Sequence, residues 1–488
     1  MNRFPNFLLM LVVLILAAVP AACRRDRASE NSSPPALPKA PERSAAAVTS
    51  YADVVARISD AVVTVRSEST VRAPRRFPFS NDPLFREFFG DLFGGPSQPR
   101  LERGLGSGVI VTEGGYILTN HHVVDGADEI RVEMSENHSY KAKIVGSDPP
   151  TDLAVLKVDA DNLPVLRLGN SDQVRVGDVV LAIGNPFGVG KTVTAGIISA
   201  KERSTGMGAG TFESFLQTDA PINRGNSGGA LVNTAGDLIG INSQIVSTSG
   251  AGGNVGIGFA VPSNMARQVA EQLIKSGNVR RGKLGVQIRS VDQNIAANLG
   301  LDAAKGAIVS SVEAGSPAQR AGIRQYDVII QLNGKDVEDS NQLRNRIAAL
   351  QPGTEVTLTV VREGQRQQVR VKLSELSEES GRASSAQGDD RSGDGHARLG
   401  IRVAPLTPDL AAQIGVPRNA QGVVIIDVDP TGPSGQAGLR EGDLIQEVNR
   451  QPIRSIADLQ NALQRSGNRP ALLLVRRQAS QFLVTVQP

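Results

Sequence analysis

The chain has 488 residues, 40% of them hydrophobic, with 51 glycines and 27 prolines. This length and composition predict a turn-rich globular chain of about three or four domains with roughly 100–200 residues each. The 52 basic and 49 acidic residues nearly balance, and the chain has four tyrosines and no tryptophan, which excludes a basic or base-stacking surface for nucleic acid.

The N-terminus has the pattern of a targeting segment. An apolar run from Leu8 to Val19 follows Arg3, and small residues come next. The run is shorter than the ~20 residues of a membrane span, so it predicts a bacterial signal peptide over residues 1–22. Cys23 is the single cysteine, which excludes an internal disulfide and a cysteine-based metal site. Its position resembles a lipoprotein processing site, although Pro20 stands where an aliphatic residue is usual, so lipidation stays open.

The next region has the pattern of a tether followed by a mostly β domain. Residues 23–49 are polar and proline-rich, which predicts a flexible tether. Residues 50–278 alternate short apolar runs such as VGDVVLAIG with turn residues, which favours antiparallel barrels or a sandwich. Towards its end, Val269 and Leu273 fall on one face of a predicted helix that Gly277 ends.

An internal repeat fills the C-terminal part of the chain. Gly306 to Val337 aligns without gaps on Gly422 to Ile453, at an offset of 116 residues. A unit of about 90–110 residues is long enough to have its own core, so the repeat predicts two domains, over residues 280–374 and 397–488. The intervening stretch from 375 to 396 is rich in Ser, Gly and Asp, which predicts a linker.

The string NRGNSGGALV surrounds Ser227 with glycines, which are used where the backbone takes unusual angles. Such a serine is a candidate nucleophile, and it needs a base and a group that orients the base. Of the four histidines, His396 falls in the linker and His138 lies among turn residues, which leaves His121 and His122. If the backbone is extended there, the two rings point to opposite faces and one of them enters a site.

The acid candidate is Asp152. It stands at the start of the apolar run in SDPPTDLAVLKV, after two prolines that hold the chain extended. Other aspartates compete for this role, although most residues of this kind are turn residues: Asp125, Asp128, Asp148 and Asp219.

The strings TNHHVV, TDLAVLKV and GNSGGAL, in that order, resemble trypsin-like serine proteases. The longer strings VLAIGNPFG, QTDAPINRGNSGGALVN and GIGFAVPSNMA resemble the HtrA (Do/Deg) family of periplasmic proteases, and the resemblance extends from about residue 50 to the C-terminus. It implies a mostly β fold: a trypsin-like double β-barrel protease domain followed by two α+β PDZ domains.

The resemblance also implies roles for single residues. Matched by motif, His122 is the general base and His121 its neighbour, Asp152 orients His122, and Ser227 is the nucleophile. The backbone amides of Gly225, Asn226 and Ser227 form the oxyanion hole.

Both repeats resemble PDZ domains, in which an apolar-Gly-apolar loop captures the C-terminal carboxylate of a peptide. The first domain is the more complete, because Arg450 in the second replaces Gly334 of the first. The predicted carboxylate-binding residues are Lys283, Leu284, Gly285 and Val286 in the first domain, and Arg398, Leu399, Gly400 and Ile401 in the second.

The resemblance implies a regulated site. Two Gly- and Ser-rich segments, RSTGMGAGT and STSGAGGNVG, frame the oxyanion loop and reorder at small cost. Arg203 in the first segment matches a sensor arginine of the family in position. We therefore predict a catalytic site that forms fully only when a peptide binds the first PDZ domain.

The long segment between Val71 and Leu101 holds six of the 13 phenylalanines. Such a loop is usually functional or disordered, and clustered aromatics suggest an anchor for partner subunits in a homotrimer or larger homo-oligomer. This loop carries no cysteine pair, which excludes redox control through it.

These features together predict a serine endopeptidase that degrades unfolded or damaged envelope proteins without ATP, a metal or another cofactor. An alternative from another class is a periplasmic chaperone or holdase, either bifunctional or proteolytically silent. A zinc hydrolase that uses His121 and His122 is rejected, because a third ligand and helical spacing are missing.

Overall fold

The structure, a computed structural model, describes residues 50–71, 100–135, 138–185, 190–205, 212–223, 225–245, 254–376, 396–397, 399–417, 419–467 and 469–487. All of these residues belong to a unit that spans Ser50–Pro488. The predictions for the signal peptide, Cys23, the tether, the phenylalanine-rich loop and Arg398 lie outside the described residues. Within the described part, no helix is long and apolar enough to cross a membrane.

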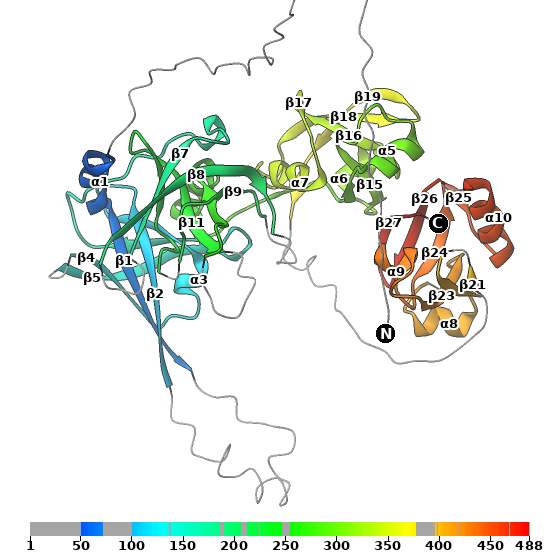
Figure 1. Cartoon of the computed structure of the whole chain (residues 1–488), viewed down its shortest axis with the longest axis horizontal. Coiled ribbons are helices and arrows are strands. Elements are labelled where there is room, and N and C mark those ends of the chain that lie inside the picture. Colours follow the sequence, from blue (N-terminus) through cyan, green and yellow to red (C-terminus); the bar gives the residue numbers. More distant parts are fainter. Residues whose placement is uncertain are drawn as a thin grey trace, which may run out of the picture. The chain divides into compact units, whose positions relative to one another are not determined.

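The first half of the protease region closes into a β-barrel that contains β1, β2, β4 and β5 (Figure 1). Its strand order is β1-β2-β3-β6-β5-β4. Alternate side chains of its strands point inward, so that Val65, Ile117 and Leu156 are fully buried. Its elements are α1 (Ala52–Ile58), η1 (Ser59–Ala61), β1 (Val62–Val71), β2 (Arg100–Ile110), β3 (Tyr116–Thr119), α3 (His121–Val124), β4 (Glu129–Ser135), β5 (His138–Asp148), η2 (Pro149–Thr151) and β6 (Leu153–Val158).

The second half closes into another barrel, with the strand order β10-β11-β12-β9-β8-β7. The two barrels share one hydrophobic core, in which Val109 and Leu118 of the first lie with Leu181 and Ile183 of the second. The elements are η3 (Ser171–Gln173), β7 (Val179–Gly184), β8 (Thr192–Arg203), β9 (Phe215–Thr218), β10 (Ala230–Asn233), β11 (Leu238–Ile245) and β12 (Gly258–Pro262). The predicted double barrel is therefore confirmed.

Helix α4 (Ser263–Ser276) covers the shared core and follows the predicted pattern. Val269 and Leu273 are buried in that core, and Gly277 ends the helix in the left-handed conformation with φ 75°.

The first PDZ domain, PDZ1, is an α+β unit whose sheet has the order β14-β15-β16-β18-β19. Leu343 and Ile347 of its helix α7 pack into the core of this sheet. The elements are β13 (Gly282–Lys283), β14 (Val286–Ser290), α5 (Gln293–Leu299), β15 (Ala307–Val312), α6 (Pro317–Arg320), β16 (Val328–Leu332), β17 (Lys335–Asp336), α7 (Ser340–Ala348), β18 (Glu355–Arg362), β19 (Gln365–Lys372) and β20 (Ser374–Glu375).

The second PDZ domain, PDZ2, repeats this arrangement, with Leu459 and Leu463 of α10 in its core. Its sheet has the order β21-β22-β23-β24-β26-β27. The elements are β21 (His396–Ala397), β22 (Ile401–Pro405), α8 (Pro408–Gln413), β23 (Val423–Val428), α9 (Pro433–Gln436), β24 (Leu444–Val448), β25 (Gln451–Pro452), α10 (Ile456–Ser466), β26 (Ala471–Arg477) and β27 (Ser480–Val486).

An aspartate that occurs at the same position in both repeats makes the same contacts in PDZ1 and PDZ2. Asp327 accepts a hydrogen bond from the amide of Arg324 and pairs with Arg362 at 2.7 Å. Asp443 accepts from the amide three residues before it and pairs with Arg477 at 2.6 Å. Both carboxylates are buried, and a buried charge needs such partners. Asp327 and Asp443, which align in the repeat, therefore stabilise the same turn in PDZ1 and PDZ2.

Candidate active site

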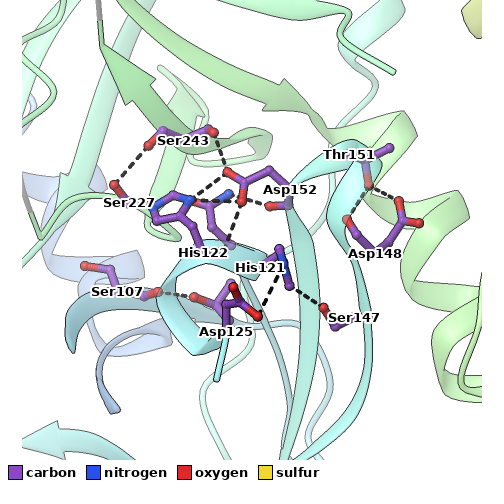
Figure 2. Close-up of polar contacts among 12 residues, drawn as sticks. Ser107, His121, His122, Asp125, Ser147, Asp148, Thr151, Asp152, Ser227 and Ser243 are labelled. Carbon is purple, nitrogen blue, oxygen red and sulfur yellow. Dashed lines mark hydrogen bonds and ion pairs between the residues drawn. The ribbon is translucent and has the colours of Figure 1, made fainter. Parts of the chain in front are cut away.

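The structure brings His122, Asp152 and Ser227 together at the junction of the two barrels (Figure 2). Nδ1 of His122 lies 2.9 Å from each carboxylate oxygen of Asp152, and the amide of His122 donates to the same carboxylate at 3.1 Å. The His122 side chain is 49% exposed and that of Asp152 is 24% exposed. A half-exposed imidazole held at one nitrogen by a carboxylate has the geometry of an oriented base.

Local backbone geometry sets this arrangement. The prolines of PPT form the short helix η2, and Asp152 follows it in the left-handed conformation with φ 56°. The carbonyl oxygen of Asp152 then accepts from the side chain of Asn120 at 2.9 Å and from the amide of His121 at 3.1 Å. Because both donors belong to the start of α3, the turn that carries Asp152 is tied directly to the helix that carries His122.

Ser243, which the sequence did not single out, contacts both Asp152 and Ser227. Its hydroxyl donates to Asp152 Oδ2 at 2.7 Å, and Ser243 is almost fully buried in β11. Its carbonyl oxygen accepts from the hydroxyl of Ser227 at 2.9 Å. A serine inside an apolar strand gives no distinct signal, because only the fold brings it to the carboxylate of Asp152.

The hydroxyl of Ser227 bonds to the backbone of β11 in this structure. It donates to Ser243, and among the described residues no hydrogen bond joins it to the ring of His122. If Nε2 of His122 is to take its proton, the hydroxyl must first exchange this bond for one to the ring.

The glycines around Ser227 are required by close approach and by backbone angle. Gly225 has φ 98° and Gly228 has φ 82°. A Cβ on Gly228 would lie 2.1 Å from the carbonyl oxygen of Ser107, which no packing change can accommodate. We call residues 225–229 the oxyanion turn. Of its predicted donors, the amide of Asn226 is engaged, since it donates to the carbonyl of Asn223 at 2.9 Å.

His121 lies apart from the triad candidates. Its Nδ1 is 2.6 Å from Ser147 Oγ, and its Nε2 is 3.7 Å from the carboxylate of Asp125 (Figure 2). The assumption that the backbone is extended here was wrong, because both histidines begin the helix α3. Their rings nevertheless diverge, since neighbouring helical positions do not share a face.

The competing aspartates have other partners. Asp148 is buried against Arg281, and Asp219 accepts from the amide of Ile197 at 2.7 Å. Asp125 contacts His121. The amide of Asp128 donates to the carbonyl of Glu68 at 2.8 Å. Among the described aspartates, Asp152 is the one bonded to His122.

Arg203, the predicted sensor, ends β8 and is exposed. Its neighbour Glu202 is the residue that reaches PDZ1, where its carboxylate accepts from Gln342. Glu202 has φ 56°, an unusual backbone angle for a residue with a side chain. The role of Arg203 stays a prediction.

The predicted carboxylate-binding loop of PDZ1 turns at a glycine that has no room for a side chain. Gly285 has φ 79°, and a Cβ there would lie 2.3 Å from Cβ of Ser316. The carbonyl of Leu284 accepts from the amide of Ala318 at 2.9 Å, which fixes the loop against α6. Lys283 pairs with Glu313 at 2.8 Å, so its charge is partly neutralised.

The PDZ2 loop repeats the glycine but differs at its edge. Gly400 has φ 73°. Ala397 pairs with Ile401, so β21 lies along β22, the strand that follows the loop. Leu399 is buried, and its carbonyl accepts from the amide of Ser434 at 3.2 Å.

No group of three or more metal-ligating side chains occurs among the described residues.

Comparison with known proteins matches this architecture. Residues 106–241 match the family model of a trypsin-like peptidase domain, and residues 282–373 and 424–477 match two PDZ-domain models. A probable periplasmic serine endoprotease, DegP-like, of Chlamydia muridarum is 45% identical over 402 residues, which cover 82% of this chain and 78% of the relative. The chain belongs to the DegP-like family of serine endoproteases. The resemblance to HtrA proteases and the fold class are thereby confirmed.

Other DegP-like relatives and solved structures agree. A probable periplasmic serine protease, do/HhoA-like, of Haemophilus influenzae is 39% identical over 89% of this chain and 91% of its own. The solved HtrA-type protease AlgW with a decapeptide is 44% identical, with a TM-score of 0.52, over 67% of this chain and 99% of that one. AlgW with a tripeptide is 42% identical, with a TM-score of 0.54, over 67% and 98%.

Proposed function

We propose that this DegP-like protease acts in the periplasm on unfolded or damaged polypeptides, with Ser227 as nucleophile, His122 as general base and Asp152 as the group that orients the base. The observation that carries this proposal is the bonding of Nδ1 of His122 to both oxygens of Asp152 at 2.9 Å. This contact keeps the imidazole proton on Nδ1 and leaves Nε2 to accept the serine proton. The names of the relatives support the location.

The proposed reaction uses side chains and water alone. Ser227 Oγ attacks the carbonyl carbon of the scissile peptide while His122 Nε2 takes its proton. The carbonyl oxygen becomes an oxyanion, which amides of the oxyanion turn stabilise. His122 then gives the proton to the leaving nitrogen as the C–N bond breaks, and an acyl-enzyme remains. His122 then takes a proton from water as the water oxygen attacks the acyl carbon, and it returns this proton to Ser227 Oγ as the ester C–O bond breaks.

We further propose that a peptide bound to PDZ1 activates this site. One bond supports a resting state that must reorganise: the hydroxyl of Ser227 donates to the carbonyl of Ser243. A ligand shifts such an equilibrium only through its different affinity for the two states. The solved AlgW structures with peptides support peptide binding by this kind of chain.

Contacts of α7 support a route for this activation. Asn341 and Asn345 both donate to the carbonyl of Glu213, at 2.9 and 2.6 Å. The buried carboxylate of Glu213 accepts from the hydroxyl of Ser204 at 2.9 Å and from the amide of Thr205 at 2.6 Å. Because α7 packs beside β14, a peptide added along β14 would bear on these contacts.

Arg281 supports a second route, toward the acid of the triad. Its guanidinium donates to the buried carboxylate of Asp148 at 2.8 and 2.5 Å and lies 4.7 Å from the ring centre of Phe212. The hydroxyl of Thr151 also donates to Asp148. Thr151 immediately precedes Asp152. Arg281, at the start of PDZ1, is therefore linked through Asp148 to the turn that carries Asp152.

A peptide whose free C-terminus fits the PDZ1 loop should raise kcat on a separate reporter substrate by about 5–150-fold, the usual range of allosteric coupling. The measurement is kcat with and without the peptide, and the control peptide has an amidated C-terminus. Arg203→Ala should reduce the gain.

Gly285→Ala should abolish this response, because the loop has no room for a Cβ. Gly315→Ala is the matched control, since Gly315 also has a positive φ in PDZ1 but its Cβ would meet open space. No response to any C-terminal peptide, together with no effect of Arg203→Ala, would contradict the activation model.

The proposed substrate class is tested with one protein in two states. The purified chain should degrade a reduced and alkylated protein much faster than the same protein in its native, disulfide-bonded form, because a double-barrel protease binds its substrate as an extended segment. Equal degradation rates for both forms would contradict the preference for unfolded polypeptides. The homotrimer or larger homo-oligomer stays a prediction, which light scattering of the same preparation checks.

A further inference from the structure

Ser107 lies in β2 of the first barrel, but both partners of its hydroxyl belong to the second barrel region. Oγ of Ser107 donates to the carbonyl oxygen of Gly225 at 2.6 Å and accepts from the amide of Asn185 at 2.9 Å. The residue is fully buried, so neither bond competes with water. A single buried hydroxyl therefore joins β2, the end of β7 and the oxyanion turn.

The backbone of Ser107 adds two more bonds. Its amide donates to the carbonyl of Ser227 at 2.7 Å, and its carbonyl accepts from the hydroxyl of Thr119 at 2.7 Å. The contact is tight, because a Cβ on Gly106 would lie 3.1 Å from the Ser227 carbonyl. Ser107 thus holds the oxyanion turn at Gly225 through its side chain and at Ser227 through its backbone.

These bonds fix one peptide plane of the turn. The carbonyl of Gly225 and the amide of Asn226 belong to the same planar peptide group. Ser107 holds the oxygen end of this group, and the carbonyl of Asn223 holds its amide end at 2.9 Å. Gly225 itself has φ 98°, a backbone angle that favours glycine. The hydroxyl of Ser107 therefore holds this peptide group from its oxygen end, next to the glycine at which the turn begins.

We propose that Ser107 is a positioning residue for the oxyanion turn of this protease. Its hydroxyl sets the orientation of the peptide group that joins Gly225 to Asn226, and so keeps the amides of Gly225 and Ser227 aimed at the same point. This inference rests on the proposed role of those two amides as oxyanion donors. A displacement of about 1 Å in such a group costs on the order of a hundredfold in rate.

The test uses the full chain with Ser107→Ala and a matched control, Ser263→Ala. Ser263 is also fully buried, and its hydroxyl donates to a glycine carbonyl, that of Gly169 at 3.0 Å, at the start of α4. Ser107→Ala should lower kcat by about 10–100-fold while KM stays unchanged, since an oxyanion-hole defect acts in the transition state. Ser263→Ala should keep kcat within about twofold, as expected for a change away from the site.

Both variants are assayed well below their own Tm, so that lost stability does not count as lost activity. A plateau of kcat/KM that falls without a shift in its pH midpoint supports positioning, because the base and its carboxylate are untouched. A loss of kcat equal to that of Ser263→Ala, or an increase in KM alone, would overturn the proposal. If the wild-type chain cleaves no peptide bond, this result contradicts the proposed protease function, whereas an active wild type with an unaffected Ser107→Ala contradicts only the role of Ser107.

A second variant covers the case in which Ser107→Ala does not fold. Ser107→Cys keeps a weak donor of similar shape. It should retain more activity than alanine but less than serine, and a fluorophosphonate probe should label Ser227 in it more slowly than in the wild type. A wild-type labelling rate in Ser107→Cys would overturn the proposal.

Discussion

Replacing Ser227 with alanine should lower kcat for casein hydrolysis by about 10⁴–10⁶-fold, the usual cost of removing a triad nucleophile. The loss is this large because the hydroxyl supplies the oxygen that forms the acyl-enzyme, and no neighbouring group can replace it. Folding should survive, because among the described residues the hydroxyl of Ser227 makes one hydrogen bond, to the carbonyl of Ser243. The measurement is casein degradation by the purified chain, with the Tm of both proteins beside it.

The matched control is Ser276→Ala. Its hydroxyl also donates to a backbone carbonyl at 2.9 Å, that of Gln272, but at the exposed end of α4. Ser276→Ala should keep full activity, which separates the loss of the nucleophile from the loss of a serine hydroxyl. Casein turnover by Ser227→Ala at the wild-type rate would remove Ser227 from the mechanism and attribute the activity to another group.

The chain organisation could be predicted because its signals are local or repeated. The glycines around Ser227 occupy positive φ angles or positions without room for a Cβ. Both requirements select glycine, so they can be recognised in the sequence. The repeat could be found because Asp327 and Asp443 each close the same turn with an arginine. Helix α4 could be predicted because one face of it is buried.

Other parts of the site could not be predicted, because they depend on contacts between distant segments. Ser243 reaches Asp152 across 91 positions of the chain, and Ser107 reaches Gly225 across 118. A serine in a strand has the same local pattern whether it binds a carboxylate, a backbone carbonyl or water. The contact of Glu202 with Gln342 of PDZ1 could not be predicted for the same reason, because 140 positions of the chain separate the two residues.

Replacing His122 with alanine should abolish hydrolysis to about the same extent as loss of Ser227, because the residues of a triad act as a unit. Replacing His121 with alanine should leave activity within about tenfold of the wild type, a loss that reflects a small displacement of α3. The physical difference lies in the partners. His122 is held by the carboxylate of Asp152 at 2.9 Å, whereas His121 is held by Ser147 at 2.6 Å on the side away from Ser227.

The two histidine variants control for each other, since they remove the same ring from adjacent positions of α3. The measurement is kcat/KM for one peptide substrate, with the labelling rate of Ser227 by a fluorophosphonate as a second readout. Loss of activity in His121→Ala alone would show that the assignment is off by one residue. Equal and complete loss in both would mean that the bond between His121 and Ser147 is needed to hold the base in place, which the separate contacts of His122 with Asp152 argue against.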